Sequence, residues 1–382
     1  MRLADCHNVQ DFRRLARQRL PDPIFHYIDG AADDELTKAR NTKAFARCDL
    51  VPHVLAGVEH VDMRTTIMGR ETALPLLLSP TALQRLFHWQ GERAVARAAE
   101  RAGLWFGISS LATVSLEEIG RTISSPKLFQ LYAHKDEGLN RAMIAAAKAA
   151  QFDALALTVD TIVGGNRERC LRSGFTSPPK LTPSSALSFA MHPRWTVNYL
   201  CREKFELPNL SAHVAAGSNV AVSVADYLNN MLDQSLDWKK AERIRADWGG
   251  AFCLKGVMSV EDARRAVDIG ATAIMLSNHG GRQLDGSRAP FDQLAEIMDA
   301  VGDRIEVICD GGVQRGTHVL KALSLGAKAC SGGRLYLYAL AAAGEAGVDR
   351  ILTKFRAEIE RDMKLMGVRS LAELGRANLR WR

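Results

Sequence analysis

The chain has 382 residues, of which 47% are hydrophobic and 24% are charged, a composition typical of a globular protein with a large buried core. Its formal net charge of +7 favours anionic partners, but acidic residues stand beside most Arg and Lys and no nucleic-acid motif occurs, so nucleic acid is not expected as a partner. The polar N-terminus lacks the apolar core of a signal peptide, and no apolar run is long enough to cross a bilayer. We therefore expect a cytoplasmic protein, either soluble or peripheral on the inner face of the membrane.

Residues 1–70 precede the first strand and are predicted to form helices and a small hairpin that cap the rest of the chain. From Leu74 onward, one unit recurs: an apolar run, a polar or Gly-rich end, then a helical pattern. The length of the runs and their lack of alternation are typical of buried parallel strands. The eight runs are Leu74–Leu78, Leu104–Ile108, Lys127–Leu131, Ala154–Val159, Ala251–Leu254, Thr272–Leu276, Ile305–Cys309 and Ala327–Cys330.

Apolar residues at helical spacing follow most of these runs, in Gly91–Ala102, Glu137–Ala150, Val260–Ile269, Phe291–Val301 and Gln314–Leu325. Eight strands that each lead to a helix predict a closed (β/α)8 TIM barrel of the α/β class, and the whole chain, 1–382, as one domain. A doubly wound sheet is the alternative fold.

The seven Cys include no C-x-x-C pair. Cys253, Cys309 and Cys330 lie in apolar runs and are expected to be buried thiols.

A long insert, residues 176–235, separates the fourth and fifth strands. It begins Ser177-Pro178-Pro179 and mixes aromatic residues such as Trp195 and Tyr199 with Arg194 and Arg202. The insert is too long for an ordinary connection. Two interpretations stay open: an unstructured loop, or a lid or membrane-touching segment.

Polar residues follow the apolar strands, and in a barrel such ends meet at one mouth. His279, after strand six, has a side chain whose ordinary pKa suits proton abstraction near neutral pH. Asp160, after strand four, is placed to orient and stabilise its imidazolium. Arg167 and Arg282 are suited to hold a carboxylate between them.

The remaining strand ends predict a phosphate-bearing cofactor. Lys255 stands on an apolar strand and is expected to face an anion or an electron-rich ring. The ends of strands seven and eight, Asp310-Gly311-Gly312 and Gly332-Gly333-Arg334, are Gly-rich and each precedes a helix. Exposed N–H groups and a helix N-terminus there bind phosphate. These patterns leave the redox identity of the cofactor open, and no metal site is expected.

The segment Ser277-Asn278-His279-Gly280-Gly281-Arg282-Gln283 resembles the signature of the FMN-dependent 2-hydroxy acid dehydrogenases and oxidases, a family that includes lactate dehydrogenases, mandelate dehydrogenase and glycolate oxidase. The resemblance covers nearly the whole chain. Further blocks fall in the family's order and spacing: Tyr27-Ile28-Asp29-Gly30-Ala31-Ala32, Gln130-Leu131-Tyr132, Leu157-Thr158-Val159-Asp160-Thr161 and Leu254-Lys255-Gly256-Val257.

This resemblance implies a role for each matching residue. Tyr27 and Tyr132 would bind the substrate, and His279, assisted by Asp160, would take a proton while two electrons pass to FMN. Lys255 would stabilise the reduced flavin. The residues implied to line the flavin ring are Thr81, Ala82, Ser109, Gln130 and Thr158; Ser277 is also placed in the cofactor site, and Asp310, Gly312, Gly333 and Arg334 would hold the ribityl chain and phosphate. A homotetramer is implied as well.

Several positions depart from the family pattern. Gln314 stands where a phosphate-binding Arg is usual, which would weaken FMN retention unless Arg315 or Arg334 compensates. Ile162 replaces a common Pro and Cys170 a common Asp. Leu111 stands where a bulky aromatic is often found, which indicates a roomier pocket.

We therefore predict FMN-dependent oxidation of a small L-2-hydroxy acid, lactate-like or mandelate-like, with electrons passed to a quinone or another acceptor. The insert favours a dehydrogenase at a membrane surface, whereas Ala82 is more typical of oxidases that form hydrogen peroxide. No haem domain precedes the barrel, so a built-in haem acceptor is not expected. Two other classes stay open: an FMN barrel such as isopentenyl diphosphate isomerase, which would not need the two Arg, and a non-catalytic barrel that binds a small acid and has weakened FMN binding.

Overall fold

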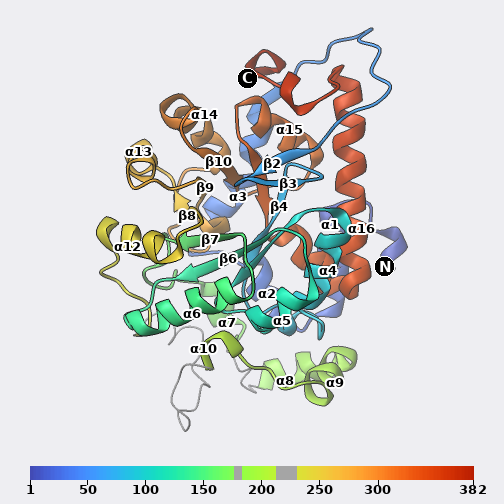
Figure 1. Ribbon diagram of the computed structural model, residues 1–382. Coiled ribbons are helices and arrows are strands. Elements are labelled where there is room, and N and C mark those ends of the chain that lie inside the picture. Colours follow the sequence, from blue (N-terminus) through green and yellow to red (C-terminus); the bar gives the residue numbers. More distant parts are fainter. Residues whose placement is uncertain (176–182, 212–229) are drawn as a thin grey trace.

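The computed structural model describes residues 1–175, 183–211 and 230–382. Eight parallel strands form a closed barrel in the order β10-β11-β4-β5-β6-β7-β8-β9, and pairing of β9 with β10 closes it (Figure 1). Closure rules out the doubly wound sheet and confirms the predicted barrel. The strands are β4 Leu76–Thr81, β5 Trp105–Ser109, β6 Lys127–Tyr132, β7 Ala154–Thr158, β8 Ala251–Val257, β9 Ala273–Ser277, β10 Glu306–Asp310 and β11 Ala329–Gly332.

Two strands, β4 and β8, each run three residues past their predicted apolar runs, further than the other barrel strands. β4 continues to Thr81 and β8 to Val257, and in each the ladder is interrupted, between Leu78 and Thr81 and between Lys255 and Val257. Irregularities of this kind redirect side chains and are frequent beside active sites. Both lie at the carboxyl end of the barrel, where the predicted site residues gather.

Helices surround the barrel and follow the strands (Figure 1). Side-chain caps mark the starts of several: Asp136 accepts from the N–H groups of Gly138 and Leu139 at α6, and Ser259 accepts from Asp262 at α13. α16 is interrupted at Ala343 and Gly344, whose backbone angles are not helical. The outer helices are α4 Glu92–Ala102, α5 Leu116–Thr122, α6 Glu137–Ala149, α12 Trp238–Trp248, α13 Val260–Asp268, α14 Pro290–Val301, α15 Gly316–Ser324 and α16 Arg334–Met366.

The N-terminal region caps both ends of the barrel. It contains η1 Leu3–Asp5, α1 Val9–Arg19, α2 Asp22–Asp29, α3 Leu36–Lys43, η2 Ala44–Arg47, and the hairpin of β2 Thr65–Ile67 and β3 Arg70–Thr72. Ile67 and Met68 of the hairpin pack with Leu77, Trp105 and Leu128 inside the barrel, so they close the amino end of the strands. α3 packs on η4 His279–Gly281 at the carboxyl end. An unpredicted strand, β1 Cys48–Leu50, pairs with β12 Leu379–Trp381.

Most of the insert that the structure describes is helical. After α7 Glu168–Arg172 come α8 Pro183–Ala190, α9 Pro193–Cys201 and α10 Pro208–Ser211, so the interpretation as an unstructured loop is wrong for α8, α9 and α10. The indole N–H of Trp195 donates to the carbonyl of Leu86 at 2.7 Å, and Asn209 accepts from the N–H of Leu116 at 3.0 Å. These bonds hold the insert against the barrel. Residues 176–182 and 212–229 of the predicted insert lie outside the described residues.

No helix in the described ranges is both long and apolar enough to span a bilayer. The Cys of those ranges are free thiols, and Cys253, Cys309 and Cys330 are buried as predicted. Cys201, in α9, is exposed instead.

Candidate active site

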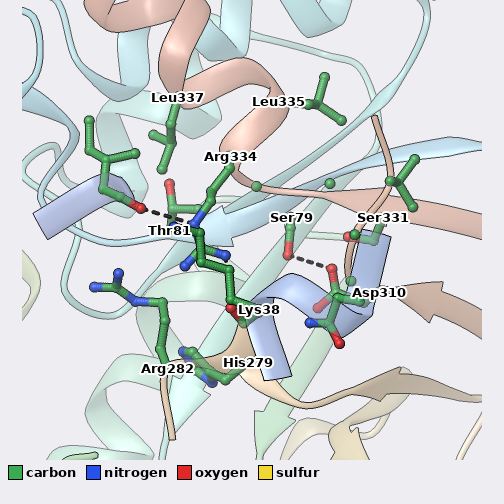
Figure 2. A pocket seen from close by; sticks show the side chains of 18 of the residues that line it. Lys38, Ser79, Thr81, His279, Arg282, Asp310, Ser331, Arg334, Leu335 and Leu337 are labelled. Carbon is green, nitrogen blue, oxygen red and sulfur yellow. Dashed lines mark hydrogen bonds between the residues drawn. The ribbon is translucent and has the colours of Figure 1, made fainter. Parts of the chain in front are cut away.

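The carboxyl ends of the barrel strands open into one cavity of about 690 Å³, which α2, α3 and the start of α16 complete (Figure 2). Side chains from distant segments meet there because parallel strands all end on the same rim. Twelve of the predicted site residues line the cavity: Tyr27, Thr81, Ala82, Tyr132, Arg167, Lys255, His279, Arg282, Asp310, Gly312, Gly333 and Arg334.

Five predicted residues lie behind this wall. Asp160 contacts His279 from outside the cavity lining, and Ser109, Gln130, Thr158 and Ser277 are buried in the strands. The Gln130 amide donates to the Thr158 hydroxyl at 2.6 Å, while its Oε1 is buried without a hydrogen-bond partner in the described part of the chain. A buried acceptor without a donor indicates a group that a ligand satisfies.

His279 is held in a defined orientation. Its φ of 56° lies in the left-handed region, which is uncommon for a residue other than Gly and is often found at functional sites. The backbone N–H donates to Ser277 Oγ at 3.1 Å, and Nδ1 lies 2.9 Å from Asp160 Oδ1. Because a carboxylate only accepts, Nδ1 carries the proton and Nε2 keeps its lone pair. Nε2 lies 3.5 Å from the Tyr132 hydroxyl, on the cavity side.

The electrostatics of this pair suit a base. Burial lowers the pKa of His279, and although Asp160 raises it, the net pKa stays below the ordinary value, so the imidazole is neutral at pH 7. Burial would raise the pKa of Asp160, but His279 and Lys255 outweigh it and hold that pKa below the ordinary value. The pair is therefore a neutral base backed by a carboxylate.

Two guanidiniums face the same space without an acidic partner. Arg282 donates to the carbonyls of Tyr27 at 2.6 Å and Gly30 at 3.1 Å, and its guanidinium carbon lies 4.8 Å from the centre of the Tyr27 ring. The Arg167 guanidinium makes a long hydrogen bond, 3.5 Å, to Gln283 and lies 5.9 Å from the centre of the Tyr27 ring, while its Nε is buried without a hydrogen-bond partner among the described residues. Burial and the nearby Arg282 lower the pKa of Arg167 to about 10. Two close cations with no carboxylate beside them, among the described residues, form a site for a small anion.

Lys255 does face an anion, as its place on an apolar strand predicts. Its Nζ is buried and lies 3.3 Å from both Asp310 Oδ2 and Ser277 Oγ. Burial would lower the pKa of Lys255, but Asp310 and Asp160 outweigh it and raise the pKa. Asp310 also accepts from Ser277 at 2.8 Å and from Ser79 at 3.3 Å, the second of which Figure 2 shows.

The Gly-rich ends of β10 and β11 form the other part of the cavity. Within the described part of the chain, no side chain caps the N-terminus of α16 at Gly333, so the first N–H groups of that helix lack side-chain acceptors there. A Cβ on Gly312, whose φ is 75°, would lie 2.2 Å from the carbonyl oxygen of Asn41, so only Gly fits where α3 crosses this turn. Arg334 donates to the carbonyls of Ile28, Gly280 and Gly30.

Gln314 lines the cavity but is held by protein groups. Its Oε1 accepts from Gln10 at 2.8 Å and its Nε2 donates to Thr42 at 3.3 Å. Arg315 pairs with Glu358 at 2.9 Å and does not line the cavity. Of the two Arg expected to compensate for Gln314, Arg334 therefore lines the cavity and Arg315 does not.

Several lining residues were not predicted from sequence, among them Arg13, Lys38, Asn41 and Thr42 of the N-terminal cap and Ser331 of β11. Figure 2 shows Lys38 near the centre of the site, between Arg334 and His279. Its pKa is lowered by burial. The cap residues follow no strand and carry no motif, so only the packing of α1 and α3 on the barrel mouth reveals them.

The residues present fit FMN. The cavity volume falls within the roughly 300–1,000 Å³ of small-molecule sites. Lys255 offers a buried cation, Gln130 an unsatisfied acceptor, and the uncapped N-terminus of α16 a place for a phosphate. Those groups match what a flavin ring and a phosphate require.

Comparison with known proteins gives one consistent result. The model of a family described as FMN-dependent dehydrogenase matches residues 16–381. Glycolate oxidase of Spinacia oleracea is 39% identical over 372 residues, which are 97% of this chain and 95% of the relative. L-lactate dehydrogenase of Alcaligenes faecalis is 38% identical over 365 residues, 95% of this chain and 96% of the relative. The crystal structure of the monotopic membrane protein (S)-mandelate dehydrogenase superposes with a TM-score of 0.93 and 33% identity over 99% of this chain and 100% of that one.

Proposed function

The chain belongs to the FMN-dependent dehydrogenase family, and we propose that it oxidises a small L-2-hydroxy acid to the 2-oxo acid, with His279 as the base. The observation that carries this proposal is the joint placement, in one cavity, of the neutral His279 imidazole backed by Asp160 and of two guanidiniums that have no acidic partner among the residues described. An isopentenyl diphosphate isomerase would not need the two guanidiniums. Bound FMN supplies the two-electron oxidant for the reaction.

Each protein group has a distinct task in this reaction. Arg167 and Arg282 bind the substrate carboxylate, and their forked donors fix its orientation. This places the hydroxyl-bearing carbon before His279, whose Nε2 accepts a proton. The imidazolium that forms is stabilised by Asp160, 2.9 Å from Nδ1. Tyr132, whose hydroxyl lies 3.5 Å from Nε2, hydrogen-bonds the substrate from the same side, and Tyr27 lies beneath Arg282.

The groups that would hold the cofactor come from all around the rim. Lys255 would stabilise negative charge on the ring system, with Thr81, Ala82, Ser109, Gln130, Thr158 and Ser277 around it. Gly312, Gly333, Arg334 and Asp310 would hold the ribityl chain and phosphate. Arg334 does this without help from position 314, because Gln314 carries no charge and is held by Gln10 and Thr42. We therefore expect FMN to bind but to be lost more readily on dialysis than from a variant with Arg at 314.

Anaerobic mixing with lactate, glycolate, mandelate and longer 2-hydroxy acids tests the proposed reaction. The expected result is a yellow protein whose flavin band bleaches with at least one of these acids. A protein that stays colourless after addition of FMN, or a flavin band that none of these acids bleaches, would contradict the proposal. The first outcome would favour a non-catalytic acid-binding barrel.

The electron acceptor that we propose is a membrane quinone, so the protein acts as a dehydrogenase rather than an oxidase. The support is a face formed by α8, α9 and the turn between them, which project from the rest of the molecule (Figure 1). Leu187, Met191 and Leu200 of this face are 64%, 71% and 72% exposed. Arg194 lies in α9 and Arg202 directly follows that helix. Apolar side chains flanked by cations suit the surface of an anionic bilayer.

An oxidase is the second candidate, favoured by Ala82 and by the similarity to glycolate oxidase. Rapid formation of hydrogen peroxide in air, with slow reduction of quinone, would show that the protein is an oxidase.

We further propose that the protein is a homotetramer in the cytoplasm or on the inner membrane face. Light scattering should then detect a single species of four times the chain mass.

A further inference from the structure

A second cavity, of about 220 Å³, lies beside the first. It is enclosed by α1, the segment that follows β4, α9 and the interrupted part of α16. Phe87 lines both cavities, so the two spaces share one aromatic wall residue. The volume is below the roughly 300–1,000 Å³ of sites that enclose a drug-sized ligand, and it therefore suits a single substituted ring rather than a nucleotide.

Aromatic rings form much of its wall. Trp195 and Tyr199 are stacked with their centres 5.1 Å apart, and the guanidinium carbon of Arg202 lies 4.7 Å from the centre of the Trp89 ring. Walls of this kind favour a planar ligand that stacks between rings.

The polar side chains of the wall include Arg85, Glu203 and Asn198. Arg85 is buried, and its Nε has no hydrogen-bond partner in the described part of the chain. The other donors of that guanidinium reach the carbonyls of Glu203, Lys204 and Thr113. Glu203 also lines the cavity, but its carboxylate is paired with Arg93 at 2.9 Å and lies 3.6 Å from Arg85. An unused buried donor beside aromatic rings calls for a ligand with oxygen acceptors and no positive charge.

The position of the cavity indicates that its ligand also carries an apolar tail. α9 lines it with Trp195, Asn198 and Tyr199, while Val197 and Leu200 of the same helix are 57% and 72% exposed. The face proposed above to touch a bilayer is thus continuous with the wall of the cavity. A ligand that stays in lipid by its tail can place its ring here.

We infer that this second cavity binds the ring of a quinone, which accepts the electrons released by hydroxy-acid oxidation; this inference rests on the proposed function. The exchange balances: the hydroxy acid loses two electrons and two protons to become the oxo acid, and the quinone gains both to become a quinol. Arg85 would donate to a quinone oxygen, and Phe87 would separate the quinone from the flavin cavity.

Quinone binding to the second cavity is tested with duroquinone. Its four methyl groups occupy every ring position to which the thiol of the exposed Cys201 could otherwise add. Because Trp89 and Trp195 line the cavity, duroquinone should quench tryptophan fluorescence saturably in the protein with and without FMN. Asn198→Phe puts a ring into the cavity from α9 and should raise the dissociation constant at least tenfold. Val197→Phe, one residue along and on the exposed face, is the matched control and should bind as the natural protein does.

A second measurement links binding to electron transfer. With the flavin first reduced anaerobically by the hydroxy acid, duroquinone should reoxidise Asn198→Phe at least tenfold more slowly than Val197→Phe. Equal quenching and equal reoxidation in both variants would overturn the inference, as would saturable quenching by benzoate in preference to duroquinone. If no hydroxy acid bleaches the flavin, the proposed function is wrong. The fluorescence measurement still tests quinone binding in that case, because it does not depend on the oxidation of a hydroxy acid.

Discussion

His279 shows how one residue acquires its function from three contacts. Asp160 holds Nδ1, Ser277 accepts the backbone N–H, and the left-handed φ turns the ring into the cavity. In His279→Gln the base is lost, and flavin reduction by the hydroxy acid should fall about 10²- to 10⁴-fold, the usual range for a general base, with FMN still bound. Stopped-flow absorbance checks this. His60→Gln, at an exposed site, serves as the control, and equal rates in both variants would remove His279 from the reaction.

The pH profile of flavin reduction should report on the same pair. A base acts only when neutral, and burial holds the pKa of His279 below 6.5, so the rate should decline only as the pH falls through a midpoint below 6.5. Asp160 raises that pKa; Asp160→Asn should therefore move the midpoint to still lower pH and slow the reaction as well. Rates measured between about pH 5 and 8 test the sign. A midpoint that moves upward in Asp160→Asn would contradict the assignment.

Arg282 should determine substrate affinity more than flavin binding. A charged hydrogen bond contributes about 1.5–3 kcal/mol, so Arg282→Met should raise the hydroxy-acid concentration for half-maximal flavin bleaching roughly 10- to 100-fold. Arg282→Lys keeps the charge but loses the fork, and an intermediate effect is expected. FMN content measured by absorbance is the control for folding. An unchanged half-maximal concentration would exclude Arg282 from the carboxylate site.

At the scale of elements, Trp195 links α9 both to the segment that follows β4 and to its helical neighbour α8. Trp195 donates to Leu86 and stacks between Phe189 and Tyr199, with ring centres 5.3 and 5.1 Å away. Trp195→Ala removes one hydrogen bond and two ring contacts, about 2 kcal/mol together. Hydrogen exchange in residues 183–211 should then be on the order of 30-fold faster, with the barrel strands unaffected. Val197→Ala, on the exposed face, should leave exchange as it is; equal protection in both variants would contradict this account.

At the scale of the whole molecule, the exposed side chains of α8 and α9 should decide where the protein resides. Replacing Leu187, Met191 and Leu200 with Ser should reduce co-sedimentation with anionic vesicles several-fold. Leu284 and Leu365 are exposed to 75% and 67% outside these helices, so Leu284→Ser with Leu365→Ser is the control and should leave binding intact. Equal loss in both variants would show that exposed leucines in general, and not this face, cause the association.

The sequence by itself determined the barrel and the centre of the site. Eight buried strands show as eight apolar runs because both faces of each strand are covered, and the rim residues follow because all parallel strands end on one side. His279, Asp160, Arg167, Arg282 and Lys255 were predicted for this reason, and the structure brings them together. The predicted ends of the strands were less exact, because β4 and β8 continue through irregularities in the ladder beyond their predicted apolar runs.

Only the tertiary structure decided what covers the barrel mouth and what lies beside it. Lys38 and Asn41 reach the cavity through the packing of α3 on η4, a contact between segments that no local pattern connects. Arg315 and Gln314 are adjacent in sequence, yet one pairs with Glu358 outside the cavity and the other lines it. The second cavity, likewise, exists because α9 packs over Leu86 while α16 is interrupted at Ala343. Periodicity records which residues are buried, whereas contacts between distant elements depend on how those elements pack.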